Sequence, residues 1–411
     1  MSSLSLSAGF RAIPATARLN AAVFAAGFVT FVNMWCTQAI LPVLAAAFHV
    51  SQARTGLTVT APLIATAMMA PLIGAISDRF GRKTLICAAA ALLVIPTGLA
   101  ASAGTLNEFV LCRFLQGLML PFIFTVTIAY IGDESSGAAT AKLAGTYTSG
   151  AIFGGFSGRL ISGLVTQAAG WRTGLALIAL LSLAMAVLIM AALPREQKFK
   201  PLYGVGRALK SFPMHLSNPR LLATYAVGFG VLFSLVASFT FINFRLAEPP
   251  YLMGPAALGG IFVVYLGGVV MSPIAARLAN RFGRKRVMSV AGPVVCAGLL
   301  LTLASPLWAI IVGLLLISSA IFIQQTLATA FVGAAAREGK STAVGLYGTF
   351  YYIGGSCGGL APAGVWRDFG WPGCVAIVVV MQLVMLGVVL RFWRPLRTVS
   401  SGGLEKPGNR G

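Results

Sequence analysis

The residues of this chain that can do chemistry are charged and amide side chains inside long apolar runs. Two arginines, Arg113 and Arg159, lie within such runs, and Gln116 follows Arg113 on the same helical face. A buried arginine is costly in an apolar environment and normally faces a cavity or a partner. We expect both arginines to line a central cavity, where they contact a solute or help to relay protons. Arg113 can instead bond backbone carbonyls, and either side chain can extend to the membrane surface.

Acidic residues are scarce, and none lies in the middle of an apolar run. The nine are Asp78, Glu108, Asp133, Glu134, Glu196, Glu248, Glu338, Asp368 and Glu405. Only Glu108, five residues before Arg113, lies near the mouth of the expected cavity. It is a candidate proton site, and the alternative is a solvated helix start.

Further polar side chains on the apolar runs are candidates for the cavity wall. They are Asn33, Thr37, Gln38, Asn243, Gln324 and Gln325. Each can equally hold two helices together through a hydrogen bond. Asn33 and Thr37 share one helical face, and Gln38 is adjacent.

The sequence contains no residue pattern that indicates an enzyme or a cofactor site. The six cysteines form no CxxC pair and the two histidines fall in loops, so we expect no metal site. No nucleophile or paired acid lies in the apolar runs, and no phosphate-binding loop is present. We expect no catalytic residues and no cofactor.

The composition indicates a membrane protein. Hydrophobic residues make up 58% of the 411 residues and charged residues 9%, a balance that a bilayer accepts and a soluble surface does not. We expect an all-α protein with twelve membrane-spanning helices. The approximate limits are 20–43, 55–76, 84–103, 106–131, 140–166, 171–193, 220–243, 257–279, 286–304, 307–333, 341–364 and 371–393.

Basic residues set the expected orientation. The net charge of +21 fits cytoplasmic loops rich in Lys and Arg better than a nucleic-acid partner. With both termini in the cytoplasm, 24 of the 30 Lys and Arg residues are cytoplasmic, which favours this N-in, C-in topology. The polar stretch 194–219 divides residues 1–193 from 220–393 as a cytoplasmic linker, and 394–411 reads as a disordered tail.

An internal repeat relates the two halves. Pro273 follows Pro71 by 202 residues, and each proline precedes the same Arg-Phe-Gly-Arg-Lys segment. A second match aligns two groups of seven residues at an offset of 200. The first group is Gly145, Tyr147, Gly154, Gly155, Gly158, Gly170 and Trp171. The second group, in the same order, is Gly345, Tyr347, Gly354, Gly355, Gly358, Gly370 and Trp371. Duplicated halves around a central site are common in secondary transporters, so we expect two pseudo-symmetric six-helix bundles.

The repeated loop resembles a signature of the major facilitator superfamily. Its first copy has Gly74, Asp78, Arg79, Gly81, Arg82 and Lys83, and its second has Asn280, Arg281, Gly283, Arg284 and Lys285. The run Arg113-x-x-Gln116-Gly117 is similar to a motif of the drug:proton antiporter group. The stretch from Gly150 to Gly158 resembles the antiporter motif of exporters without its usual proline. The run from Gly154 to Gly163 looks most like the acriflavine-sensitivity branch of bacterial exporters.

The resemblance implies a cytoplasmic latch. Asp78 would meet the start of the helix that begins near Ser341, since a carboxylate is stabilised at a helix N-terminus. Asn280 replaces the acid in the second copy, so the latch is expected to be asymmetric. The alternative is a loop that only fixes topology.

Glycine stripes are expected to bring helices into close contact. They are formed by Gly150, Gly154 and Gly158, with Gly155 adjacent, and by Gly354 and Gly358, with Gly355 adjacent. Such smooth contacts would also let the helices slide during transport.

The function expected from the resemblance is secondary transport, as a monomer in the bacterial inner membrane. The expected solute is a small organic molecule exported in exchange for protons, as in multidrug efflux. Exporters of cationic drugs in this family use a carboxylate within the membrane; its absence here favours neutral or anionic solutes. An importer, a uniporter, and a transporter-like sensor without flux remain alternatives.

Overall fold

The computed structural model describes residues 14–196, 213–336 and 340–393, and every regular element in these ranges is helical. Most of the expected linker, and the whole expected tail 394–411, lie outside the described residues. Within the described ranges, eight helical stretches are long and apolar enough to cross a membrane. These are Ala15–Ala47, Arg82–Ser102, Leu106–Glu134, Trp171–Ala192, Pro219–Ala247, Pro255–Phe282, Leu307–Ala335 and Thr342–Phe392.

The helices fall into two sets along the chain. The first set is α2 (Ala15–Trp35), η1 (Gln38–Ile40), α3 (Leu41–Ala47), α4 (Gln52–Thr55), α5 (Leu57–Met69), α6 (Ile73–Phe80), α7 (Arg82–Ser102), α8 (Leu106–Glu134), α9 (Gly137–Ala169) and α10 (Trp171–Ala192). The second set is α12 (Pro219–Ala247), α13 (Pro255–Ile261), η2 (Phe262–Val264), α14 (Tyr265–Phe282), α15 (Arg284–Leu301), α16 (Leu307–Ala335) and α17 (Lys340–Phe392).

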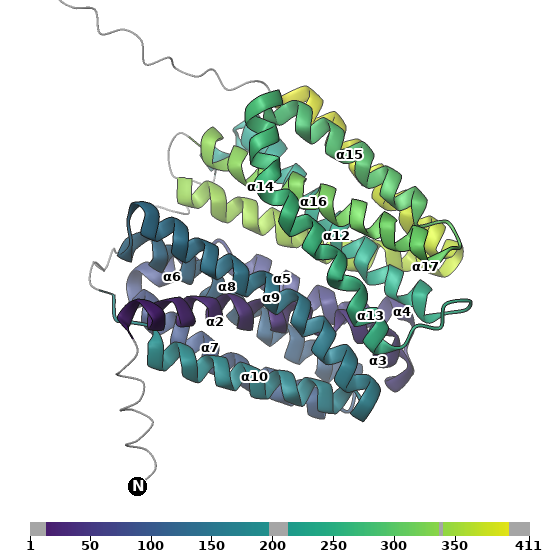
Figure 1. Cartoon of the computed structure of the whole chain (residues 1–411), viewed down its shortest axis with the longest axis horizontal. Coiled ribbons are helices and arrows are strands. Elements are labelled where there is room, and N and C mark those ends of the chain that lie inside the picture. The colour runs from purple at the N-terminus through teal and green to yellow at the C-terminus, as the bar shows by residue number, and fades with distance from the viewer. Residues whose placement is uncertain (1–13, 197–212, 337–339, 394–411) are drawn as a thin grey trace, which may run out of the picture.

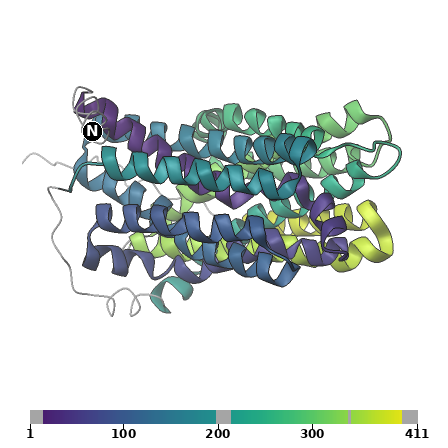
Figure 2. The same ribbon diagram turned by 90° about the horizontal axis from the view of Figure 1, so that it is seen from below.

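The two sets lie side by side. Figure 1 shows the first set, in purple to teal, below the second set, in teal-green to yellow. In the orthogonal view the helices run roughly along the long axis of the molecule (Figure 2). We call the contact surface between the sets the seam.

Several expected spans are interrupted. The run 20–43 breaks after Trp35 into a turn and η1, and α3 then begins at Leu41 with Pro42 in its first turn. The run 55–76 is divided into α4, α5 and α6. The runs 341–364 and 371–393 are both part of α17, which is broken at Gly370 by a non-helical backbone (φ 58°, ψ −147°).

The internal repeat is visible in the backbone. Gly81 and Gly283, the glycines of the repeated loop, have φ of 85° and 88°. Each ends one helix and starts the next with the same non-helical geometry. Residues that carry a side chain rarely adopt positive φ values of this size, which explains why both positions are glycine.

The glycine stripes bring helix backbones together in both sets. A Cβ atom on Gly154 would lie 2.3 Å from the carbonyl oxygen of Phe28 in α2, and one on Gly354 would lie 2.0 Å from that of Phe229 in α12. Gly150 and Gly158 meet α2 in the same way, and Gly358 meets α12. Any side chain at these positions would force the helices apart.

Gly154→Ala should therefore destabilise the protein. The new methyl group meets backbone that cannot move aside, and we expect a cost of about 1–3 kcal/mol, seen as a lower midpoint of thermal unfolding in detergent. The matched control is Gly145→Ala on the same helix, where the added Cβ would meet nothing within 4 Å. That variant should be neutral or slightly more stable, because alanine favours helix. Equal midpoints for the two variants would contradict the packing role.

Candidate functional site

Arg113 is fully buried on α8 and donates to backbone carbonyls. Its Nη1 lies 2.6 Å from the oxygen of Asn33, its Nη2 2.8 Å from that of Met34, and its Nε 3.0 Å from that of Thr58. The first two carbonyls belong to the end of α2, where the helix breaks. The third is freed by Pro62, which has no N–H to donate four residues back. These bonds are the ones that the alternative interpretation of Arg113 predicts, and the choice between this role and a cavity role stays a prediction.

Proline on α8 creates the reciprocal situation. Pro121 leaves the carbonyl of Gly117 without its usual helical donor. The hydroxyl of Thr66 on α5 donates to that oxygen at 3.1 Å. A Cβ on Gly117 would lie 2.3 Å from the oxygen of Pro62, so the two helices touch along their backbones. Helices α5 and α8 therefore each satisfy a carbonyl that a proline opens in the other.

A buried hydrogen-bond network extends from Arg113 through the first set. Gln116 accepts a bond from Arg113 Nη1 and donates to the hydroxyl of Thr97 at 2.8 Å. Thr97 donates to Asn33 Oδ1 at 2.8 Å, and Asn33 Nδ2 donates to Ser182 Oγ at 2.8 Å. The network joins α2, α7, α8 and α10. It brings Asn33 and Gln116 together within the first set instead of across the seam.

The second set has a smaller network in a comparable place. Gln324 on α16 donates to Gln382 on α17 at 2.8 Å, and Gln382 donates to Ser234 on α12 at 2.9 Å. Gln325 accepts a bond from the hydroxyl of Tyr347 at 3.1 Å. Asn243 is buried and donates to the carbonyl of Phe239 in its own helix.

Arg159 on α9 lies at the seam. Its exposed fraction is 1%, so it does not extend to the surface. Its Nη1 donates to the carbonyl of Gly155 at 2.7 Å, and its Nε donates to Gln38 Oε1 at 2.8 Å. Gln38 in turn donates from Nε2 to the hydroxyl of Thr240 on α12 at 3.2 Å. This chain of bonds joins the two helix sets through a buried cation.

Three aromatic rings surround the guanidinium of Arg159. Its Cζ lies 4.8 Å from the ring centre of Trp35, 4.3 Å from that of Phe262 and 4.9 Å from that of Tyr265. Trp35 belongs to the first set, and the other two rings belong to the second. Cation–π contacts of this kind stabilise a desolvated cation by about 2 kcal/mol or more. Arg159 and these partners form the candidate site.

The sets also touch at one end of the molecule, which we call the closed end. There α3, α4 and α13 lie together (Figure 1). Gln52 donates to Glu248 at 2.8 Å, and Gln167 accepts from the amide of Ala256 at 3.2 Å. A Cβ on Gly163 would lie 2.3 Å from the oxygen of Pro255. Backbone therefore meets backbone across the seam next to the candidate site.

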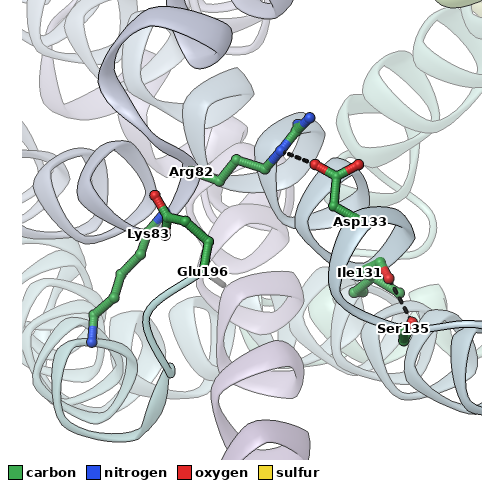
Figure 3. A network of polar contacts seen from close by, with 6 residues as sticks. All are labelled: Arg82, Lys83, Ile131, Asp133, Ser135 and Glu196. Atoms are coloured by element: carbon green, nitrogen blue, oxygen red, sulfur yellow. Dashed lines mark hydrogen bonds and ion pairs between the residues drawn. The ribbon is translucent and has the colours of Figure 1, made fainter. Parts of the chain in front are cut away.

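The repeated loops contact the ends of neighbouring helices. Arg82 pairs with Asp133 at 2.5 Å, and the amide of Lys83 donates to Glu196 at 3.1 Å (Figure 3). The ammonium of Lys83 donates to the carbonyl of Leu193, and that of Lys285 donates to the carbonyl of Leu390. The two lysines thus make equivalent contacts in the two sets.

Other loop residues make few described contacts. Arg79 lies over the ring of Phe80, and Arg281 lies over that of Phe282. A Cβ on Gly74 would meet nothing within 4 Å. The side chains of Asp78, Lys340 and Ser341 lie outside what the structure describes, so the latch stays a prediction.

Sequence reasoning missed several partners of the predicted residues. Trp35, Phe262 and Tyr265 carry no polar pattern that marks a site, and only their packing around Arg159 reveals them. Thr97, Ser182 and Gln382 are polar residues within apolar runs, and this was an available signal. Glu108 accepts a bond from the amide of Gly104 and caps α8 together with Thr105, as expected for a solvated helix start.

The sequence matches a family profile and several curated relatives. The profile described as "Major Facilitator Superfamily" matches residues 23–268 and 253–409. The inner membrane transport protein YnfM of Escherichia coli K12 is 34% identical over 390 residues, covering 94% of this chain and 93% of YnfM. The uncharacterized MFS-type transporter YybF of Bacillus subtilis is 31% identical over 379 residues, covering 91% of this chain and 93% of YybF.

Solved structures share the fold at low sequence identity. A point mutant of the nucleoside transporter NupG has a TM-score of 0.76 at 14% identity, covering 93% of this chain and all of NupG. The xylose transporter XylE of E. coli, in a partially occluded inward-open conformation, has a TM-score of 0.73 at 14% identity, covering 92% of this chain and 97% of XylE. The human organic anion transporter MFSD10 has a TM-score of 0.69 at 18% identity, covering 92% and 100%.

Arg113→Lys should destabilise the fold more than it alters solute binding. Lysine keeps the charge, but its single ammonium cannot reach carbonyls of both α2 and α5 in the same fork geometry. Leaving buried carbonyls unpaired costs about 1–3 kcal/mol each, so the midpoint of thermal unfolding should fall. The control is Arg367→Lys, at an arginine with an 83% exposed side chain. An unchanged midpoint with weakened solute binding would instead place Arg113 in a cavity.

Proposed function

Because this chain is a member of the Major Facilitator Superfamily, we propose that it exports small organic solutes in exchange for protons by alternating access. Its matched relatives and the proteins that share its fold are transporters and not enzymes. The chain is accordingly a multi-pass membrane transporter, and the expectation that it is not an enzyme is confirmed. Direction, coupling ion and solute are the parts that we propose.

Twelve crossings account for the helices in this proposal. The stretch Thr342–Phe392 supplies two crossings because it is broken at Gly370. Three further crossings come from helices outside the eight apolar stretches. The chain of α4 to α6 is interrupted, α9 is rich in Gly, Ser and Thr, and α15 begins with three basic residues. Each of these features lowers the mean hydropathy or the length of a helical stretch, but does not prevent that stretch from crossing the membrane.

The proposed orientation places both termini in the cytoplasm. The excess of basic residues in the loops on that side supports it. In this orientation the closed end faces the outside of the cell. A bacterial inner-membrane location agrees with the name of the relative YnfM.

The observation that carries the proposal is the buried chain from Arg159 through Gln38 to Thr240. It places a charged side chain at the seam between two helix sets that share an internal repeat. Transporters of this plan bind solute at the interface of their repeats and rock the repeats around it. A charge that is buried away from both surfaces fits a solute site better than a surface contact.

Export and proton coupling rest on the sequence motifs. The stretch from Gly150 to Gly158 is similar to the exporter motif, and Arg113-x-x-Gln116-Gly117 is similar to the drug:proton antiporter motif. No acid lies in the middle of a span, so neutral or anionic solutes suit the site better than drug cations. We further propose that the transporter works as a monomer.

Flux measurements test the proposal. Inside-out membrane vesicles that contain the chain should accumulate solutes from a panel of neutral and anionic compounds when a proton gradient is imposed. A protonophore should abolish the accumulation, and vesicles without the chain should show none. Accumulation only in right-side-out vesicles would establish import, and accumulation that ignores the protonophore would exclude proton coupling.

Asp78→Asn tests the latch. Losing the carboxylate removes about 0.3–1 kcal/mol of stabilisation at a helix N-terminus, so we expect roughly two- to fivefold slower flux at equal membrane levels. Asn280→Ala, in the second copy of the loop, should cost less because that position has no acid. Normal flux for Asp78→Asn would leave the loop with a topological role alone.

A further inference from the structure

We infer that Arg159 and Tyr265 form a binding site for the carboxylate of an organic monoanion that has an aromatic or apolar body. The inference deepens the proposed function and rests on it, since it names the class of solute for the same transporter. Neither the family match nor the names of the relatives assigns a ligand to these residues. The evidence is the unpaired charge, the unpartnered polar atoms and the apolar surroundings of Arg159.

The charge of Arg159 has no anionic partner among the described side chains. The acids Asp133 and Asp368 pair with other arginines, Arg82 and Arg367. A buried ion without a counter-ion costs several kcal/mol, and the rings around Arg159 offset only part of this. A bound anion would neutralise the charge.

Two buried polar atoms at the site lack a hydrogen-bond partner. They are Nη2 of Arg159 and the hydroxyl oxygen of Tyr265, whose ring lies 4.9 Å from the Arg159 Cζ. Arginine Nε and Nη1 are already used by Gln38 and Gly155. A carboxylate has two oxygens and accepts charge-assisted bonds from such donors. One carboxylate oxygen can take the Nη2 hydrogen, and the other can take the Tyr265 hydroxyl hydrogen.

The residues around Arg159 determine which kind of ligand body the site favours. Trp35, Phe262 and Tyr265 present rings to the guanidinium, and Phe239 and Phe322 extend this aromatic surface beyond Tyr265. A single positive charge matches a single negative charge. A dianion such as inorganic phosphate would keep a net charge buried among the rings, which is unfavourable. An aromatic carboxylate gains both the ion pair and ring contacts.

The site is closed on one side. A Cβ on Gly259 of α13 would lie 2.7 Å from the carbonyl oxygen of Arg159, and Gly163 meets Pro255 one turn further along α9. A ligand therefore reaches Arg159 from the side away from the closed end. Because Arg159 belongs to the first set and Tyr265 to the second, a carboxylate between them contacts both moving parts.

Equilibrium binding tests this inference without requiring flux. The full chain is purified in detergent, and binding of radiolabelled benzoate is measured up to about 10 mM. Benzamide, the neutral isostere, serves as competitor. We expect saturable benzoate binding that benzamide displaces at least tenfold less effectively than unlabelled benzoate does. Inorganic phosphate should displace it no better than benzamide.

Variants assign the binding to this site. Arg159→Gln should weaken benzoate binding at least tenfold, and Tyr265→Phe should weaken it about threefold while the ring remains. Arg159→Lys should fall between Arg159→Gln and the unchanged chain. The matched control Arg367→Gln, an exposed arginine, should bind benzoate normally. If Arg159→Gln fails to fold, the other two variants decide.

The outcomes separate this inference from the proposed function. Wild-type benzoate affinity in Arg159→Gln and Tyr265→Phe, equal displacement by benzamide, or no saturable binding would each overturn the anion site. Arg159-dependent binding without flux in vesicles would leave the site standing and reject the exporter. Transport of neutral solutes without benzoate binding would reject the anion site and leave the exporter standing.

Discussion

Backbone carbonyls that lose their helical donors are the constraint on which this structure depends. No water is available in a bilayer to satisfy them, so another group of the protein must do so. Pro62 and Pro121 open one carbonyl each, and the break after Trp35 opens two more. Arg113 closes three of these four, and Thr66 closes the other. Arg113 on α8 therefore supplies donors to the carbonyls freed at the break after α2 and at Pro62 within α5.

The same constraint explains why the two buried arginines differ. In Arg113 the Nε and both terminal nitrogens donate within the protein, so its hydrogen-bonding capacity serves the fold. In Arg159, Nη2 has no acceptor and the charge faces aromatic rings. Rings stabilise a cation without accepting its hydrogen bonds in the plane of the guanidinium. A ligand with in-plane acceptors therefore adds to what surrounds Arg159 without replacing it, and nothing comparable is open at Arg113.

Much of this arrangement can be predicted from the sequence, and the part that cannot has a physical reason. Composition predicts the helical membrane fold, and the repeated Arg-Phe-Gly-Arg-Lys predicts two loops of equal shape, as Gly81 and Gly283 show in their backbones. The spacing of Arg113 and Gln116 correctly predicts that they share a face, but not whether that face meets a cavity or a neighbouring helix. Arg113 and Arg159 look alike in sequence because their partners, the carbonyl of Thr58 and the ring of Phe262, come from distant segments. Polar residues within apolar runs predict a buried hydrogen bond but do not identify its partner.

The bonds within and across the helix sets favour motion between the sets. Inside each set the buried bonds from Asn33 to Ser182 and from Gln324 to Gln382 are 2.8 Å long. Across the seam the buried bonds from Gln38 to Thr240 and from Thr60 to Ser356 are 3.2 and 3.3 Å long, and the contact of Gln52 with Glu248 is exposed to solvent. Exposed polar contacts are stabilised little because water competes for them. These polar bonds across the seam are longer or more exposed than those within a set, and two packed bodies that move about such an interface are one established form of conformational switching. A ligand can bias this motion only if it binds one arrangement better than the other. A carboxylate bound at Arg159 would meet that condition, because the ring partners of Arg159 come from both sets.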